Sequence, residues 1–187
     1  MLPLNNARVT SPYGITRGDG KVHTGIDLIS TSGDRQVKAI KGGLVRGTFV
    51  DPYGFGNYVS IEHTDGVRAL YCHLEEFRCR AGDMVKTGDV IGIEGETGNS
   101  TGVHLHLELR ETPYLAHHHI NVAEYLSIEN KKGDVVEGKT SLTREDKIQL
   151  IKNKVGYDDN TCKYIFDFYK YGNEALDKLA KALQENE

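Results

Sequence analysis

The chain has 187 residues, of which 38% are hydrophobic, and this length suits one medium domain or one domain with a small appendage. A formal net charge of -4 offers no basic face, so we expect no nucleic-acid partner. The sequence contains no run of about 18 apolar residues, which argues against a membrane span. The first ten residues lack the apolar core of a signal peptide, so we expect synthesis in the cytoplasm without an export signal.

Residues 11–109 read as short β-branched or alternating segments separated by glycine, a pattern typical of an all-β domain. We predict a mainly β, antiparallel and sandwich-like domain over residues 1–128. Its expected strands cover residues 25–29, 43–50, 57–63, 67–74, 90–94 and 104–110.

The segment 103–109 is the strongest chemical signal, because three leucines alternate with polar residues. Successive side chains of a strand point to opposite faces, so the leucines would enter a core while His104, His106 and Glu108 line the other face. Two histidines on one face can bind metal, although solvated histidines on an exposed face are the simpler alternative. Glu108 either orients a metal-bound imidazole or is a solvated carboxylate near the strand end.

Two upstream segments supply more candidate groups. His23 and Asp27 are separated by a glycine and two β-branched residues, which favour a turn entering a strand over a helix. In the next alternating segment, the pattern predicts Tyr71 and His73 on one face and Cys72 as a small core residue on the other. Hydrolytic zinc sites use three His, Asp or Glu ligands and keep one position for water, and this inventory suffices for such a site.

These residues, in this order, resemble the lysostaphin-type zinc endopeptidases, which cut peptide bonds in bacterial peptidoglycan. The resemblance extends from about residue 11 to about residue 126, and several independent motifs carry it in the family's order. They are His23-xxx-Asp27, Tyr-Cys-His73-Leu, His104-x-His106, Ser-Pro-Tyr-Gly at 11–14 with Arg17, Gly-Phe-Gly-Asn-Tyr-Val at 54–59, and the glycine-rich stretches 81–92 and 97–102.

The resemblance implies a role for each matching residue. It makes His23, Asp27 and His106 the ligands of Zn²⁺, and His73 and His104 the catalytic pair. One histidine of the pair would take a proton from the attacking water, and the other would stabilise the oxyanion and protonate the leaving amine. Sequence alone does not assign these two tasks. Asn57 and Tyr58 are further candidates for oxyanion donors, with ordinary strand packing an equal alternative for Tyr58.

Beyond the predicted domain the composition changes. Residues 129–141 are rich in Glu, Asn, Lys, Gly and Asp and are expected to form a linker. In residues 142–187 the apolar period becomes about 3.6, which predicts a small α-helical module. Its aromatic residues exceed what one face buries, so it could bind cell wall or form a homodimer, with an ordinary bundle core as the alternative.

The sequence therefore predicts a zinc endopeptidase acting on stem or cross-bridge peptides of peptidoglycan. Without a signal peptide, such an enzyme would reach the wall after release from the cell, as a phage endolysin does, or as a virion-associated protein. The consecutive histidines 117–119 lie outside the family pattern, and we expect them in a loop, because adjacent residues of an extended chain point apart.

Three alternative functions fit these residues less well. A non-catalytic wall-binding or hydrolase-activating protein of the same fold would typically lack some metal ligands, whereas all are present here. A non-haem iron oxygenase also uses two histidines and a carboxylate, but has no evident need for His73 and His104. A structural zinc domain is disfavoured, because the candidate ligands contain no cysteine pair.

Overall fold

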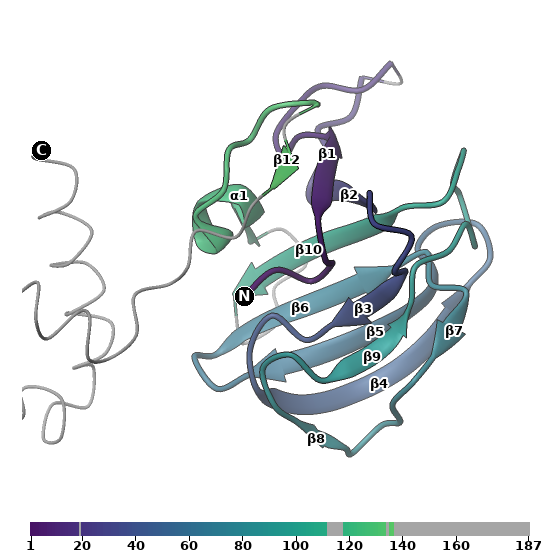
Figure 1. Cartoon of the computed structure of the whole chain (residues 1–187), viewed down its shortest axis with the longest axis vertical. Helices are drawn as coiled ribbons and strands as arrows, with labels where there is room; N and C mark the ends of the chain where they lie inside the picture. Colours follow the sequence, from purple (N-terminus) through teal and green to yellow (C-terminus); the bar gives the residue numbers. More distant parts are fainter. Residues whose placement is uncertain (19, 112–117, 134, 137–187) are drawn as a thin grey trace, which may run out of the picture. The chain divides into compact units, whose positions relative to one another are not determined.

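The computed structural model describes residues 1–18, 20–111, 118–133 and 135–136. These residues lie in the first of two units of the chain, Met1–Lys139 (Figure 1). The strands are β1 (Ala7–Ser11), β2 (Ile26–Ser30), β3 (Gln36–Lys38), β4 (Gly43–Asp51), β5 (Gly56–His63), β6 (Val67–Cys72), β7 (Glu76–Phe77), β8 (Met84–Val85), β9 (Val90–Ile93), β10 (Leu105–Glu111), β11 (His119–Ile120) and β12 (Val135–Val136), and the helix is α1 (Val122–Leu126).

Within the described residues the strands form two antiparallel sheets. The larger sheet has the order β12-β1-β2-β10-β6-β5-β4-β8, with β11 paired to β10, and the smaller has the order β3-β9-β7. The predicted mainly β, antiparallel architecture is confirmed. The short strands β3, β7, β8, β11 and β12 were not predicted, because two or three residues are too few to display an alternating pattern. The five-residue strand β1 was not predicted either.

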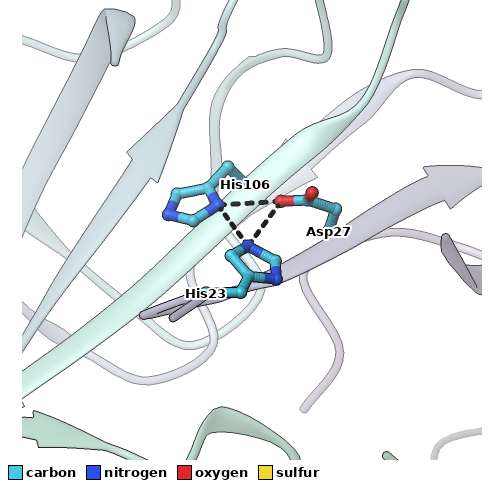
Figure 2. A group of neighbouring side chains, drawn as sticks. All are labelled: His23, Asp27 and His106. Carbon is cyan, nitrogen blue, oxygen red and sulfur yellow. Dashed lines mark hydrogen bonds and ion pairs between the residues drawn. The ribbon is translucent and has the colours of Figure 1, made fainter. Parts of the chain in front are cut away.

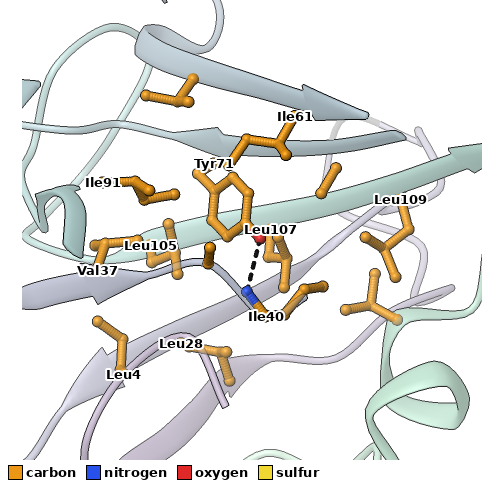
Figure 3. Close-up of a cluster of buried hydrophobic side chains, with 14 of the residues drawn as sticks. Leu4, Leu28, Val37, Ile40, Ile61, Tyr71, Ile91, Leu105, Leu107 and Leu109 are labelled. Atoms are coloured by element: carbon orange, nitrogen blue, oxygen red, sulfur yellow. Dashed lines mark hydrogen bonds between the residues drawn. The ribbon is translucent and has the colours of Figure 1, made fainter. Parts of the chain in front are cut away.

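A single apolar cluster joins the two sheets (Figure 3). Tyr71 is fully buried there, and its hydroxyl accepts a hydrogen bond of 3.0 Å from the backbone N–H of Ile40. The cluster includes Leu28, Ile61, Leu105, Leu107 and Leu109 of the larger sheet and Val37 and Ile91 of the smaller one. The leucines of β10 thus enter the core as predicted, which leaves His106 and Glu108 on the opposite face of the larger sheet.

The predicted face assignment around His73 is wrong. Tyr71 pairs with Leu107 on the core face, whereas Cys72 pairs with His106 and so lies on the other face, although it is fully buried. His73 follows the end of β6 and has a φ of 63°, in the left-handed region that interrupts strand alternation. This backbone turn separates His73 from Tyr71 and brings its ring close to those of His104 and His106.

The structure also bears on two other expectations, those for residues 117–119 and for the predicted linker. His119 was expected in a loop, but it lies in β11 and pairs with Arg110, while residue 117 lies outside the described residues. In the predicted linker 129–141, the strand β12 pairs with β1, and the side chain of Asn130 bonds to both backbone groups of Tyr13 at 2.8 and 2.9 Å. The linker boundary stays a prediction, and the helical module at 142–187 lies outside the described residues.

Candidate metal centre

Three donor atoms converge on the face of the larger sheet opposite the core (Figure 2). His23 Nε2 lies 3.1 Å from both His106 Nδ1 and Asp27 Oδ1, and His106 Nδ1 lies 2.8 Å from Asp27 Oδ1. All three residues are buried. Two imidazole nitrogens and one carboxylate oxygen from segments far apart in the sequence thus form a compact triangle.

Sheet register places two of the three residues. His106 on β10 pairs directly with Asp27 on β2, and directly opposed residues of an antiparallel pair present their side chains to the same face. His23 precedes β2, where its backbone N–H donates to the carbonyl of Ile15 at 2.8 Å. Gly25 lies between the two upstream residues, and a Cβ there would be 2.5 Å from the Leu107 carbonyl oxygen and 2.6 Å from His106 Cε1. Only glycine therefore permits this close approach of the turn to β10.

Each imidazole is oriented by a contact at its second nitrogen. His23 Nδ1 donates to the carbonyl of Pro12 at 2.8 Å, which leaves the lone pair of Nε2 facing the triangle. His106 Nε2 is buried without a hydrogen bond and lies 3.7 Å from Glu108 Oε2. Metal-binding histidines commonly direct their second nitrogen at a carbonyl or a carboxylate in this way.

Glu108 is fully buried, which excludes the predicted alternative of a solvated carboxylate. It accepts a hydrogen bond of 2.7 Å from the Thr24 hydroxyl, forms an ion pair with Arg110, and lies 3.3 Å from His119 Nδ1. Burial raises the pKa of Glu108, but the nearby His106 imidazole and the hydrogen bond from Thr24 outweigh it and lower the pKa to about 2. A carboxylate that stays ionised thus lies beside His106.

The electrostatics of the triangle suit a cation. Burial raises the pKa of Asp27, but the adjacent imidazoles of His106 and His23 outweigh it and hold the pKa far below its usual value. Burial lowers the pKa of His106, yet the hydrogen bond to Asp27 and the nearby carboxylate of Glu108 prevail and raise it. The coordinating nitrogen of a histidine must lose its proton before it can bind a metal ion. A proton on the His106 nitrogen that faces the triangle would therefore compete with a metal ion for the same position.

The donor set and its spacing fit zinc. Ligand atoms about 2.0 to 2.2 Å from a tetrahedral zinc ion lie roughly 3.3 Å from one another, close to the observed separations of 2.8 to 3.1 Å. Three ligands of the His and Asp types also leave a fourth position for water or substrate. The spacing therefore needs little adjustment to accept the ion.

Two further histidines flank the triangle. His73 Nδ1 donates to the carbonyl of Thr97 and His104 Nδ1 to the carbonyl of Gly102, both at 2.8 Å. Their ring centroids are 4.7 Å apart, and His104 Nε2 lies 3.8 Å from Asp27 Oδ1. Burial lowers the pKa of His73 to about 4. Both rings therefore have a proton fixed on Nδ1, which leaves Nε2 as the basic atom of each neutral imidazole.

The comparison with protein families agrees with this arrangement. Residues 21–122, more than half of the chain, match the model of the family described as Peptidase family M23. The chain belongs to peptidase family M23. The resemblance predicted from the sequence motifs is thereby confirmed.

Several M23 relatives share the same region. The DD-carboxypeptidase/endopeptidase Mpg of Neisseria meningitidis is 42% identical over 113 residues, which are 58% of this chain and 25% of Mpg. Lysostaphin of Staphylococcus simulans is 40% identical over 98 residues, which are 52% of this chain and 19% of lysostaphin. The chain thus spans about a quarter or less of the length of these relatives.

Solved M23 structures share the fold. The catalytic domain of the prophage-encoded M23 protein EnpA from Enterococcus faecalis has 35% identity and a TM-score of 0.55, over 62% of this chain and 88% of that one. The catalytic domain of lysostaphin has 31% identity and a TM-score of 0.55, over 64% of this chain and 89% of that one.

A tight contact between the loops around Gly56 and Gly98 positions the hydrogen-bond acceptor of His73. Gly56 and Gly98 both have positive φ, and a Cβ on Gly98 would lie 2.3 Å from the Gly56 backbone nitrogen. Beside them, the Thr97 hydroxyl accepts from the Asn57 N–H and donates to the Leu74 carbonyl, both at 2.9 Å. The glycines thus let the two loops meet, and the Thr97 carbonyl is held where His73 needs its acceptor.

Arg17 and Tyr58 have contacts that the sequence motifs do not reveal. Arg17 forms a 2.7 Å ion pair with Asp27 Oδ2, the oxygen that does not face the triangle, and about 45% of its side chain is exposed. The ring of Tyr58 packs against Phe49 and Phe55 at centroid distances of 4.9 and 5.6 Å. The oxyanion-binding role of Asn57 stays a prediction, and these ring contacts favour the predicted alternative of strand packing for Tyr58. Among the described residues, no helix has the length and apolar character to cross a membrane.

Proposed function

We propose that this M23 protein is a zinc-dependent endopeptidase that hydrolyses peptide bonds of bacterial peptidoglycan. The observation that carries the proposal is the convergence of His23, Asp27 and His106 beside a second pair of oriented histidines. The names of the relatives support it, since they include lysostaphin, a glycyl-glycine endopeptidase and a peptidoglycan DD-endopeptidase.

In this proposal His23 Nε2, His106 Nδ1 and Asp27 Oδ1 hold the zinc ion. Bound zinc lowers the pKa of its water to about 7 and polarises the scissile carbonyl. Arg17 occupies Asp27 Oδ2, which favours coordination through the other oxygen alone. The ionised carboxylate of Glu108, 3.7 Å from His106 Nε2, would favour the tautomer of His106 that carries its proton on Nε2 and coordinates through Nδ1.

His73 and His104 carry the proton transfers. The Nε2 atom of one imidazole accepts a proton as the water oxygen bonds to the carbonyl carbon, and the resulting imidazolium stabilises the negative oxygen. When the C–N bond breaks, a proton passes from an imidazolium to the leaving amine. Because both Nδ1 atoms are fixed on backbone carbonyls, neither ring needs to reorient during this sequence.

The biological setting is also part of the proposal. We expect an enzyme of cell-wall lysis, either a phage endolysin that reaches the wall after release or a virion-associated protein. The similarity to a prophage-encoded M23 protein supports this setting.

The alternative of a non-catalytic protein of the same fold is less favoured, because all five histidine and aspartate side chains are present and converge. A non-haem iron oxygenase would leave His73 and His104 without a task, although its metal ligands would be similar.

Digestion of purified peptidoglycan tests the proposed function. The zinc-loaded chain should release new amine and carboxyl ends, which mass spectrometry locates at one kind of peptide bond. His104→Ala, which leaves all three metal ligands, serves as the matched control and should release far fewer ends at equal zinc content. Absence of new ends with the wild-type chain on walls of several cross-link types would contradict the proposal, and equal release by both proteins would contradict the catalytic role.

A further inference from the structure

A row of aromatic rings extends from the candidate metal centre across the face of the larger sheet. Phe55 stacks on His106 at a centroid distance of 5.8 Å, and Tyr58 meets Phe55 edge-on at 5.6 Å. Phe49 then stacks on Tyr58 at 4.9 Å with an interplanar angle of 21°. The contacts are continuous from Phe49 to a proposed zinc ligand.

Sheet register places this row on the same face as the metal centre. The strands β10, β6, β5 and β4 are consecutive neighbours, and Phe49 pairs directly with Tyr58. Val59 pairs with Tyr71 on the core face, so the adjacent Tyr58 points to the other face, the one that carries His106. The row therefore crosses β4 and β5 in the direction of β10.

Phe49 has an unusual environment for a large apolar residue in a paired strand. Its exposed fraction is 43%, and Val50 beside it is exposed as well. A Cβ at Gly47 would lie 2.4 Å from Phe49 Cζ, so the ring lies back over a position that has no side chain. The glycine and the stacked Tyr58 together hold the exposed ring in one orientation.

We propose that Phe49 and Tyr58 form a binding subsite for the substrate peptide on one side of the scissile bond. This inference rests on the proposed function and extends it to substrate length. The row offers uncharged ring faces, which suit flat peptide groups and small side chains such as those of glycine and alanine. Its continuity with His106 identifies the occupant as a segment of the chain being cleaved.

The spacing of the strands gives the distance between this subsite and the scissile bond. Neighbouring strands lie about 4.8 Å apart, so the three steps from β10 to β4 span roughly 14 Å. An extended peptide advances about 3.3 Å per residue. Phe49 therefore contacts the substrate about four residues from the scissile bond, and Tyr58, two steps from β10, about three residues from it.

Cleavage of synthetic peptides of two lengths tests the subsite with the full chain. The peptides contain the bond identified in the peptidoglycan digest, with either two or five residues on each side. Phe49→Ala should lower the ratio of kcat/KM for the long peptide to that for the short peptide by about tenfold, the scale expected when burial of one aromatic side chain is lost. Phe49→Trp should restore the ratio.

Tyr53→Ala is the matched control, because Tyr53 lies in the same β4–β5 hairpin and is 92% exposed. It should leave the ratio unchanged. Zinc content and melting temperature are measured for each variant to confirm that the fold is intact.

Three results would overturn the subsite. Unchanged kcat/KM values for both peptides in Phe49→Ala would show that the ring makes no contact with the substrate. An equal loss on both peptides would show a merely structural role. A change in the mass of the protein in solution, with no change in the ratio, would identify a second copy of the chain as the occupant. If the wild-type chain releases no new ends from peptidoglycan, the proposed function fails and the subsite fails with it, whereas a failure in the peptide comparison alone overturns only the subsite.

Discussion

Gly25 separates two proposed zinc ligands, and replacing it by alanine perturbs the metal centre without removing any ligand. A Cβ at this position would lie 2.5 Å from the Leu107 carbonyl oxygen and 2.6 to 2.7 Å from two atoms of the His106 ring. Ordinary contacts begin at 3.4 Å, so the carbonyl and the turn would have to separate by about 0.9 Å. The carbonyl belongs to the backbone of a central strand and cannot move aside by changing a rotamer.

The expected result is loss of both stability and zinc affinity. Forcing an extra methyl group into a packed site costs about 1 to 3 kcal/mol. Metal sites tolerate ligand displacements of only about 0.2 Å, and the clash with the His106 ring exceeds that. Gly25→Ala should therefore weaken zinc binding at least about tenfold, which corresponds to about 1.4 kcal/mol.

Chelator competition and thermal unfolding, with and without zinc, measure both effects. Gly18→Ala is the matched control, since a Cβ there meets no atom within 4 Å. It should bind zinc as the wild type does. If Gly25→Ala keeps wild-type zinc affinity and melting temperature, the close packing of the turn against His106 is not what positions the ligands.

Three other predictions concern individual side chains. His73→Ala and His104→Ala should keep zinc, by elemental analysis, yet lose about 100-fold or more in turnover; zinc loss in either would refute the division of roles. Glu108→Gln should weaken zinc binding about 10- to 100-fold in chelator competition, whereas Glu111→Gln at the exposed strand end should not. Burial lowers the pKa of His63, so the unfolded chain binds more protons and stability should fall as pH drops below about 6.5. His63→Gln should flatten this slope in urea titrations of zinc-saturated protein, and an unchanged slope would assign it to other groups.

The strands that carry the site were predictable because their sequences alternate over enough residues. The leucines of β10 enter the core and His106 and Glu108 lie opposite, as the period of two requires. The six predicted strands all occur, with ends within two residues of those expected. The alternating pattern therefore predicted these six strands and the face on which His106 and Glu108 lie, but not β1.

Alternation failed where the backbone leaves the strand conformation. The pattern predicted Tyr71 and His73 on one face, but β6 ends at Cys72 and the left-handed φ of His73 redirects its side chain. No local signal marks this turn, because a histidine at positive φ is stabilised by contacts with other segments, such as the Thr97 carbonyl.

Long-range contacts between polar side chains could not be predicted from the sequence either. Glu108 is contacted by Thr24, 84 residues away in the chain, and by His119 on the paired strand β11. The ion pair of Arg17 with Asp27 depends on a turn between residues 17 and 21 that precedes β2. Such pairs arise from tertiary packing, so the sequence supplied the candidates but not the contacts.

The central claim is that one zinc ion, held by His23, Asp27 and His106, makes this chain a peptidase. The most direct test is to titrate zinc into chelator-treated protein while peptide-bond cleavage in purified peptidoglycan is followed. Cleavage should rise from near zero and level off at one zinc per chain, and Asp27→Ala should neither bind the ion nor gain activity. Full cleavage by metal-free protein, or a wild-type response in Asp27→Ala, would contradict the account.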